Sequence, residues 1–508
     1  MKKTLINFEG INLALLSLLF ISLGSTAQTR LPEPFVNRSA IGDPKLKGSI
    51  HYNPEDQTYQ LKGAGSNMWA GNDQFEFAWK KVKGDFMIRA TIRFIGQGKH
   101  EHRKIGIMAR EDLDGGSRYA DACVHGDHLS SLQYRLSPGD TTGQVILSSY
   151  HPTEIALKRS GNVFTFSAAS FGENYKSVSK EIALPEELYT GIFICSHDEN
   201  VLENAEFSNV RIELPAPAGF RPYRDYIGSN LEIMDVQTGK RKILHRAPNS
   251  LQAPNWTHDG QFLIYNAEGL LYKYNLENGG IEKLNTGTAS SNNNDHVLSF
   301  DGKMMGLSNH SGPNRISTLY VMPLDGTKEP VQISSVEAGH SYLHSWSPDG
   351  SKLIFTGQRN NQFDIWSIDI KSKKETALTN TPTLDDGAEY SPDGKFIYFN
   401  SVRTGTMKIW RMRPDGSQQE QITFDEYNDW FPHISPDGQW IVYLSFPKDI
   451  DPTSHPFYQE VYIRLMPARG GVPKTIAYLY GGQGTINVPS WSPDSNKIAF
   501  ISNTRLHE

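Results

Sequence analysis

The second half of this chain repeats one short phrase six times: an aromatic or apolar residue, roughly Ser-Pro-Asp-Gly, a polar residue, and then alternating apolar residues. The aspartates of the six phrases are Asp259, Asp301, Asp349, Asp393, Asp437 and Asp494. They are separated by 42, 48, 44, 44 and 57 residues, which is the period of a four-stranded propeller blade and is too long for most helical repeats. The repeat therefore predicts a β-propeller over residues 223–508.

Each phrase has the chemistry of a tight turn between two strands. Pro fixes φ, Asp caps its own backbone, and Gly accepts a positive φ. Apolar alternation follows, as in Lys395 to Phe399, and is typical of a strand packed between neighbouring blades. Each unit is predicted to run strand, Asp-Gly turn, strand, loop, strand, turn, strand.

The two ends of the repeat region predict how the ring closes. The phrase at Asp494 belongs to a blade with two strands, while Ser229 to Val236 and Arg241 to Arg246 match the third and fourth strands of a blade. Sharing one blade between both ends removes exposed sheet edges. We therefore expect six blades, one of them built from both ends of the domain.

The repeats WSPDGSKLIF, DIWSIDI and ALTNT resemble those of TolB-like periplasmic propellers, over about residues 223–508. The resemblance implies the fold and leaves the function open, because similar repeats occur in the TolB translocation protein, in prolyl-oligopeptidase-type peptidases and in several carbohydrate-active enzymes. A peptidase is not expected, since no G-x-S-x-G elbow occurs. The chain also lacks the α/β domain that precedes the propeller in TolB itself, which argues against a translocation role.

Residues 30–213 contain no such phrase and predict a separate β-sandwich, because alternating runs recur between Gly and Asp punctuation without a convincing helix. Residues 214–222 read as a stiff, Pro-rich linker. The stretches at 48–79, 106–120 and 191–212 resemble concanavalin or laminin-G-like lectin domains, which implies a jelly-roll fold and carbohydrate binding. Trp69, Asp73 and Arg110 lie in these stretches, where they serve either turns and sheet edges or contact with a sugar.

The start of the chain predicts export. Lys2 and Lys3 precede an apolar run, and small residues at 25–27 predict signal-peptide cleavage near Ala27, with residues 1–27 removed. The run is too short for a lasting membrane span, so we expect a periplasmic or secreted protein without a transmembrane segment. The formal net charge is −6, which argues against a nucleic-acid partner. Cys123 and Cys195 either pair after export or stay as buried thiols.

Candidate site residues gather on one side of the predicted ring. Loops that lead into the inner strands and loops between second and third strands emerge at the same end of the channel, here called the mouth, and the Asp-Gly turns point to the other end. The residues expected at the mouth are Asp295, His296, His340, His344, Asp385, Asp386, Glu389, Asp429 and His433 from the inner strands, and His310, Arg315, Arg359 and Arg403 from the other loops. Gln483 and Asn487 enter with the last inner strand, and His455 lies in an insertion that is either a lid or a surface loop.

Such a ring of His, carboxylate and Arg side chains allows several functions. It could hold a divalent metal such as Mn, Zn or Fe, although no compact motif such as H-E-x-x-H is present. It could bind a glycan or peptide, or it could carry out lyase chemistry, with His344 or His433 as the base and Arg359 and Arg403 holding an anionic group. We therefore expect an exported binding protein for a glycan or an envelope protein, or alternatively a polysaccharide lyase or glycoside hydrolase with its site at the mouth.

Overall fold

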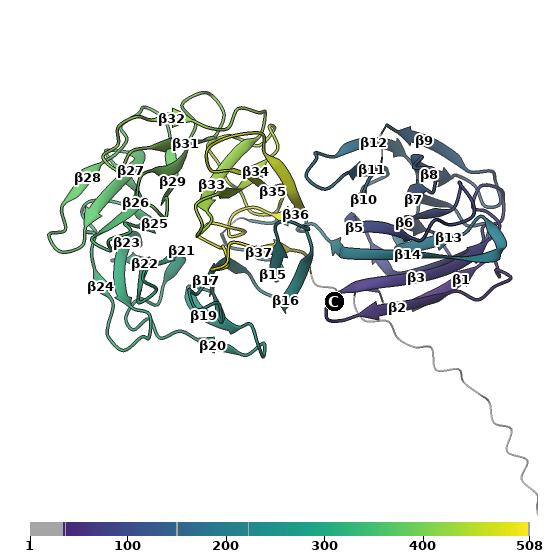
Figure 1. The fold of residues 1–508 in the computed structure, drawn as a ribbon, viewed down its shortest axis with the longest axis horizontal. Helices are drawn as coiled ribbons and strands as arrows, with labels where there is room; N and C mark the ends of the chain where they lie inside the picture. Colours follow the sequence, from purple (N-terminus) through teal and green to yellow (C-terminus); the bar gives the residue numbers. More distant parts are fainter. Residues whose placement is uncertain (1–33, 36, 149–150, 222, 506–508) are drawn as a thin grey trace, which may run out of the picture.

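The computed structural model describes residues 34–35, 37–148, 151–221 and 223–505. The signal peptide predicted for residues 1–27 lies outside this part of the chain. The described residues form strands β1 to β37 and no helix. Figure 1 shows two bodies side by side: an N-terminal domain with β1–β14 and a propeller with β15–β37. The prediction of an all-β protein is confirmed.

The N-terminal domain contains two antiparallel sheets of seven strands each. In sheet order the first comprises β1 (Asn37–Ile41), β4 (Phe75–Lys83), β13 (Glu187–Cys195), β6 (Lys104–Arg110), β7 (Tyr119–His125), β8 (Ser130–Arg135) and β9 (Gly143–Leu147). The second comprises β12 (Lys176–Glu181), β11 (Val163–Ala169), β10 (Glu154–Ser160), β5 (Phe86–Ile95), β14 (Asp198–Glu213), β3 (Thr58–Gly65) and β2 (Ser49–Asn53).

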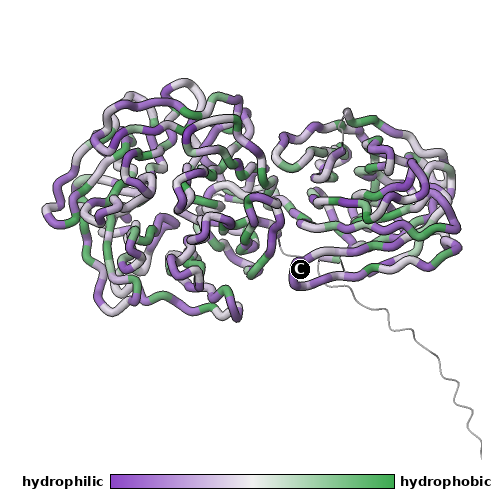
Figure 2. Tube along the Cα trace, in the orientation of Figure 1, coloured by the Kyte–Doolittle hydropathy of each residue, from purple (hydrophilic) through white to green (hydrophobic). Residues whose placement is uncertain are grey.

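The main core of this domain takes side chains from both sheets. Ile107 and Ile192 of the first sheet and Ile88, Phe166 and Phe207 of the second are fully buried in one apolar cluster. Alternate residues of a strand point to opposite faces, so β11 shows a buried residue at every second position over most of its length. Figure 2 shows the resulting mixture of hydrophobic and hydrophilic segments along the strands of both domains.

The propeller has six blades, as predicted: five four-stranded sheets and one three-stranded sheet. The four-stranded blades are β17 (Leu251–Trp256), β18 (Phe262–Ala267), β19 (Leu270–Asn275), β20 (Ile281–Lys283); β21 (Asn292–Leu298), β22 (Met304–Ser311), β23 (Ile316–Pro323), β24 (Val331–Gln332); β25 (Ser341–Trp346), β26 (Lys352–Arg359), β27 (Gln362–Asp369), β28 (Glu375–Ala377); β29 (Asp385–Tyr390), β30 (Ile397–Ser401), β31 (Lys408–Met412), β32 (Glu420–Gln421); and β33 (Asn428–Ile434), β34 (Trp440–Phe446), β35 (Gln459–Pro467), β36 (Lys474–Gly481).

The repeated phrase forms the same turn in each blade. In the third blade, Ser347 Oγ donates to Asp349 Oδ1 at 2.6 Å, the Ser351 amide donates to the same oxygen at 3.0 Å, and Gly350 has a φ of 71°. The Asp side chain thus replaces a backbone partner, and Gly accepts the left-handed conformation without strain. The sixth phrase has Ser495 in place of Gly, at a φ of 62°.

Strands from both ends of the domain close the ring. β37 (Lys497–Asn503) pairs with β15 (Ser229–Asp235) over seven positions, and β15 pairs with β16 (Arg241–Ala247). The segment inside β37 forms a single bridge, from Trp491 to Ile498. This blade therefore has three regular strands, and its innermost segment follows an irregular path into the channel.

The closing blade and its neighbour also carry the N-terminal domain. Arg211 of β14 reaches across the junction to Glu232 of β15 at 2.7 Å, and Arg241 of β16 binds the other oxygen of Glu232 at 2.8 Å. Tyr175 stacks on Tyr478 of β36 with ring centroids 3.6 Å apart. Figure 1 shows β15, β16 and β36 on the side of the propeller that faces the N-terminal domain.

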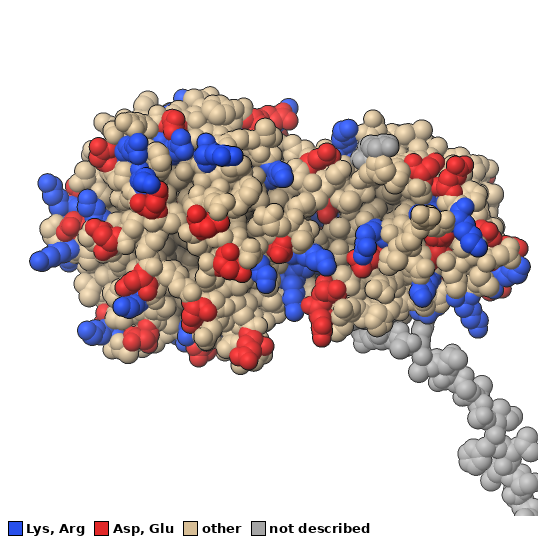
Figure 3. All heavy atoms as spheres, in the orientation of Figure 1, with Lys and Arg blue, Asp and Glu red and all other residues tan. Residues whose placement is uncertain are grey.

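The remaining surface and thiol features are simple. Cys123 and Cys195 are both free and buried, so of the two interpretations left open by the sequence the structure has the buried thiols. Charged side chains of both signs are spread over the face seen in Figure 3. A search of the described residues finds no helix that is long and apolar enough to cross a membrane.

Candidate ligand site at the propeller mouth

A cavity of about 980 Å³ opens at the mouth of the propeller. The beginnings of the inner strands, the loops between second and third strands, and the segment before β15 surround it. Its lining residues are Tyr223, Tyr226, Asn249, Ser250, Gln252, Asn266, Glu268, Gly269, Ser291, Asn292, Asn293, Asn294, Asp295, His310, Arg315, Tyr342, His344, Thr356, Phe363, Leu384, Asp386, Phe431, Thr453, His455, Phe457, Gln483 and Asn487. The six Asp-Gly turns lie at the other ends of the inner strands and contribute no residue to this lining.

An ion pair between neighbouring blades lies in the cavity wall. His344 Nε2 of β25 is 3.1 Å from Asp386 Oδ1 of β29, and Thr356 Oγ1 donates to the same oxygen at 2.6 Å. Burial alone would lower the pKa of His344, but the hydrogen bond to Asp386 and the surrounding carboxylates raise it above 6.5. Burial would also raise the pKa of Asp386, yet the bond to His344 and its charge lower it to about 2. Asp386 is therefore ionised near neutral pH, and its charge favours the protonated form of His344.

A second carboxyl group of the wall has the opposite character. Burial raises the pKa of Asp295 to about 7, against the charge of His344, which lowers it. The Asp295 amide is held by Asn293 Oδ1 at 3.0 Å, which fixes the start of β21. Asp386 is thus an ionised carboxylate of the wall, whereas Asp295 is a carboxyl group that is about half protonated at neutral pH.

The insertion after β34 forms part of the wall. His455 packs edge-on against Trp430, with ring centroids 4.6 Å apart, and its Nε2 lies 3.9 Å from Asp386 Oδ2. Phe431, with a φ of 55°, also contacts the His455 ring. Of the two interpretations of this insertion, the structure favours a covering segment, because its side chains reach the centre of the mouth.

The segment that joins the two domains covers the same side of the cavity. Tyr223 and Tyr226 both line it and pack edge-on against Phe457 of the insertion, at centroid distances of 5.1 and 5.9 Å. The Ile227 amide donates to Tyr458 Oη at 3.1 Å. The segment between the Pro-rich linker and β15 therefore lies along the propeller and supplies two exposed aromatic rings to the site.

The last inner segment brings Gln483 and Asn487 to the mouth, where the sequence placed them. Asn487 Nδ2 donates to Gln483 Oε1 at 3.0 Å, and Asn487 Oδ1 accepts from the Gly484 amide at 2.7 Å. Gly482 has a φ of 124°, and a Cβ there would lie 2.0 Å from the Pro456 carbonyl. Glycine is required at this position, because the loop passes so close to the insertion.

Most of the cavity-lining residues that were not predicted from the sequence have side-chain amides or aromatic rings. Asn292 Oδ1 and Asn294 Nδ2 are buried and have no hydrogen-bond partner within the described structure. Tyr342 and Phe363 form an aromatic side of the cavity, 6.4 Å apart. The run Ser-Asn-Asn-Asn-Asp at 291–295, which forms the start of β21, was the available sequence signal, although polar runs of this kind usually mark a turn.

Several residues expected at the mouth have partners elsewhere in the blades and lie outside the described cavity lining. Arg359 is bidentate to Glu375, with its Nη2 2.8 Å from Oε1. Arg403 Nη2 donates to Asp385 Oδ2 at 2.9 Å. Both guanidinium groups therefore neutralise carboxylates of the protein itself, instead of facing the cavity.

The other expected residues connect adjacent elements. His433 joins Glu389 Oε2 at 2.6 Å to the Ile486 carbonyl at 2.7 Å, so both of its nitrogens are engaged between blades. The remaining residues are His296, which contacts the Ile264 carbonyl; His340, which stacks on Tyr342; and Asp429, which accepts from Ser445. The mouth therefore brings together His344, Asp386 and Asp295, with His310, Arg315, His455, Gln483 and Asn487.

The geometry at the mouth does not form a compact metal site within the described residues. Among them, the one group of at least three His, Cys, Asp or Glu residues with all ligand atoms within 4.8 Å is in the N-terminal domain. His344, Asp386 and His455 share a wall, but Asp386 is already bonded to His344 and Thr356. The arrangement suits hydrogen bonding and aromatic stacking with a polar organic ligand.

A six-bladed ring with Ser-Pro-Asp-Gly turns and a polar mouth defines a propeller class, and comparison with known proteins identifies it. Residues 314–453 match the family model "TolB beta propeller domain". An uncharacterized protein of Agrobacterium fabrum (strain C58) is 43% identical over 274 residues, which are 54% of this chain and 92% of that protein. The chain belongs to the TolB-like β-propeller family.

One solved structure shows the same relationship, and a second is more distantly similar. The "putative TolB" from Agrobacterium tumefaciens is 41% identical in sequence, and its structure matches with a TM-score of 0.53. The match covers 56% of this chain and 100% of the Agrobacterium chain. TolB from Acinetobacter baumannii is 16% identical, covers 64% of this chain and 79% of its own, and has a TM-score of 0.40.

Proposed function

We propose that this protein is an exported binding protein of the bacterial envelope, whose propeller mouth binds a glycan. The N-terminal domain, on the resemblance to concanavalin and laminin-G-like modules, is a lectin-like sandwich that directs the protein to the same kind of surface. The basic start, apolar run and small residues near Ala27 support export to the periplasm or beyond.

The composition of the cavity wall carries this proposal. Ligand pockets combine aromatic surface with a few convergent polar groups, and this mouth supplies Tyr, Phe, Asn and Gln side chains around about 980 Å³. Sugar rings have an apolar face that stacks on aromatic rings and hydroxyl groups that both donate and accept. Asn and Gln side chains provide both functions, and Asn294, whose buried Nδ2 has no hydrogen-bond partner within the described residues, belongs to this wall.

Kinship with TolB-like propellers supports a protein ligand as the other possible occupant. A peptide would offer the same mixture of amides and carboxylates to Asn, Arg and His side chains. The enclosed, aromatic mouth favours the glycan, because Tyr223, Tyr226 and Phe457 cover one side of it.

The test is a binding screen of the untagged protein against oligosaccharide fragments of peptidoglycan and lipopolysaccharide, followed by calorimetry. Tyr342→Ala and Asn294→Ala should each weaken binding about tenfold, or about 1.4 kcal/mol. Phe396→Ala is the matched control, since this half-buried aromatic residue adjoins the Asp393 turn at the opposite end of the ring. Binding that is equally weakened by Phe396→Ala, or by none of the three changes, would place the ligand elsewhere.

A second candidate function is cleavage of a glycosidic bond at the same mouth. The observation in its favour is the pair of carboxyl groups with pKa values pushed apart, about 7 for Asp295 and about 2 for Asp386. A protonated acid beside an ionised carboxylate is the arrangement that glycoside hydrolases use. The parent protein should release reducing ends from the bound oligosaccharide. Asp295→Asn should lose this activity while it still binds the oligosaccharide. Binding by the parent without any turnover would exclude cleavage as a function.

The side chains of the cavity wall give weaker support to the alternative of lyase chemistry. A general base must accept a proton, but the bond to Asp386 raises the pKa of His344, against the lowering effect of burial, and so favours the protonated ring. His433 has both nitrogens bonded between blades. Neither imidazole is placed as a free base facing the cavity.

A further inference from the structure

Histidines gather at one end of the N-terminal domain, far along the chain from the propeller repeats. They come from the loop before β6, the end of β7 with its following turn, and the connection between β13 and β14. The His100 and His197 rings have centroids 4.2 Å apart, and the His102 and His125 rings lie 5.8 Å apart. In the sequence they belong to His-Glu-His at 100–102, His-Gly-Asp-His at 125–128, and His197.

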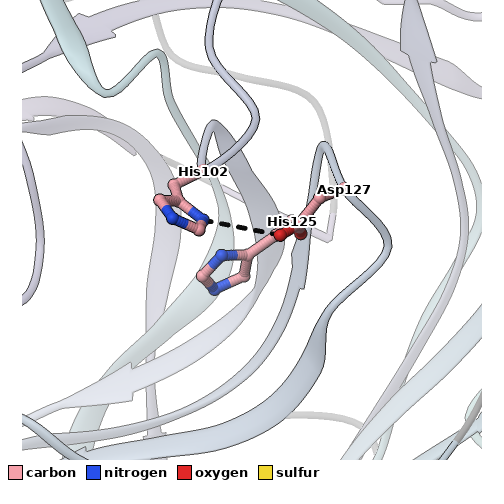
Figure 4. Close-up of side chains that lie close together, drawn as sticks. All are labelled: His102, His125 and Asp127. Atoms are coloured by element: carbon pink, nitrogen blue, oxygen red, sulfur yellow. Dashed lines mark ion pairs between the residues drawn. The ribbon is translucent and has the colours of Figure 1, made fainter.

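Three donor groups of this region converge on one point. His102, His125 and Asp127 each offer a ligand atom, and these atoms all lie within 4.8 Å of one another. His102 Nδ1 and Asp127 Oδ2 are 3.6 Å apart. Figure 4 shows His102 facing Asp127, with the His125 ring beside them.

The donor nitrogens have no other partner in the described structure. His102 Nδ1 and His125 Nδ1 are both buried from solvent and make no hydrogen bond. Leaving a buried polar atom unsatisfied is costly, and unsatisfied groups in native proteins commonly mark a missing ion or water. A cation between the two nitrogens and the Asp127 carboxylate would satisfy all three.

The far nitrogen of His125 has a hydrogen-bonding partner outside the cluster, whereas that of His102 has a carboxylate nearby but beyond hydrogen-bonding distance. His125 Nε2 lies 3.1 Å from the side-chain amide of Gln133, whose Oε1 is unpaired and buried. Turning that amide over would let His125 Nε2–H donate to Gln133 Oε1, which directs the Nδ1 lone pair at the cluster. His102 Nε2 lies 3.8 Å from Glu101 Oε1. Ligand histidines are generally oriented in this way by a second group.

Backbone hydrogen bonds hold the two contributing loops together. The Gly126 amide donates to the Arg103 carbonyl at 2.9 Å, and the Asp127 amide donates to the Glu101 carbonyl at 2.9 Å. The Leu129 amide donates to Asp127 Oδ1 at 3.1 Å, which leaves Oδ2 to face His102. The donors are thus positioned before any ion arrives.

The two neighbouring histidines have different roles. His100 Nδ1 accepts from the His102 amide at 3.0 Å, and His197 Nδ1 lies 3.3 Å from Lys104 Nζ. Because the lone pair of each neutral ring is used in these contacts, they surround the cluster and are not counted as ligands.

We propose that His102, His125 and Asp127 bind a divalent transition metal ion of the zinc type, with a fourth position open to water. Two imidazoles and a carboxylate suit this class of ion. Ligand bonds of about 2.0–2.2 Å require the donors to move slightly closer together. His102 and Asp127 can do so by side-chain rotation, because their side chains are 43% and 34% exposed.

The test uses the untagged, full-length protein after treatment with a chelator. Titration with Zn²⁺ by calorimetry should show one saturable site, and Co²⁺ at the same site should give a visible absorption band. The double change His102→Asn and Asp127→Asn, at two partly exposed positions, should weaken Zn²⁺ binding at least tenfold without changing the apo melting temperature. His51→Asn, an exposed histidine of β2, is the matched control and should bind as the parent does.

Two results would overturn the metal site. One is the absence of saturable binding of either ion to the parent protein. The other is unchanged affinity and stoichiometry in the double variant, which would assign the zinc to other residues. Should the double variant prove unstable, His125→Gln compared with Gln133→Ala separates a ligand from its outer partner: the first should abolish the cobalt band and the second should only weaken binding.

Discussion

His344 Nε2 of the third four-stranded blade lies 3.1 Å from Asp386 Oδ1 of the fourth, and this pair joins two blades at the wall of the cavity. Both side chains are largely buried, at 6% and 13% exposure. Removing one partner of a buried ion pair strongly destabilises the folded protein, because the other charge remains buried without compensation. The pair therefore serves both the shape of the mouth and the stability of the ring.

We expect Asp386→Asn to lower the free energy of unfolding by about 3–5 kcal/mol at pH 6. His344 has a raised pKa in the folded state, so its contribution is complete below pH 6.5 and is lost as the pH rises through the raised value. Urea denaturation from pH 6 to pH 9 should therefore show a loss that shrinks with rising pH. Thr356→Val removes one hydrogen bond to the same oxygen and should cost about 1–3 kcal/mol. A loss in Asp386→Asn that stays constant over the whole range would contradict the ion pair.

We expect Asp295→Asn to stabilise the protein more at pH 7 than at pH 5. The folded pKa of about 7 lies above the ordinary 3.8, so the folded state binds more protons between these values and stability falls as the pH rises through this window. Asn imitates the protonated acid and removes this fall, which amounts to about 1.4 kcal/mol per pH unit, or about 2–3 kcal/mol from pH 5 to pH 7. Denaturation curves of the parent and of Asp295→Asn, recorded at pH 5 and at pH 7, measure the difference. The exposed Asp449→Asn is the control, and equal slopes in all three proteins would contradict the raised pKa.

We expect Glu232→Gln to destabilise the closing blade by about 3–5 kcal/mol, because it leaves Arg211 and Arg241 buried without their shared carboxylate. Burial alone would raise the pKa of Glu232, but the two guanidinium charges lower it to about 2. Glu282→Gln breaks an ion pair with Lys273 in which Glu282 is 63% exposed, and should cost at most about 1 kcal/mol. Thermal melting of the two variants tests the contrast, which would be wrong if both lost the same amount.

We expect truncation after Val488 to open the ring. The cut removes β37 and exposes the β15 edge, together with fully buried Leu231 and Met234. Size-exclusion chromatography with light scattering should show aggregation, and the melting temperature should fall. A truncated protein that remains monomeric and melts like the parent would show that the closure does not depend on this strand.

We expect N-terminal sequencing of exported material to begin at or close to Gln28. The basic start, the apolar run and the small residues before the site are the reason. Replacing Ala27 with a bulky residue should block cleavage and leave the precursor. Retention of Lys2 in the mature protein would contradict export by this route.

Local chemistry made most of the propeller predictable from the sequence. The Asp-Gly turns, their spacing and the alternating strands depend on residues that are neighbours in the chain, so they indicated six blades, the shared closing blade and the side of the ring that forms the mouth. For the N-terminal domain, the all-strand character of the prediction is confirmed by two large sheets, while the jelly-roll, lectin-like form stays a prediction. Its metal-ligand cluster joins loops that are distant in sequence, and only the pairing of β6 with β7 brings them together.

Tertiary packing decided which of the candidate side chains face the cavity. His296 and His344 both lie five residues before a repeat Asp; yet His296 contacts the Ile264 carbonyl of the preceding blade, whereas His344 binds Asp386 of the following one. Both inner strands have a register irregularity, and it differs in position and length between them. Because an irregularity of this kind rotates the residues that follow it, equivalent positions in the sequence point in different directions. The sequence alone determined the ring and its two ends, while the packing of the blades selected the residues that line its mouth.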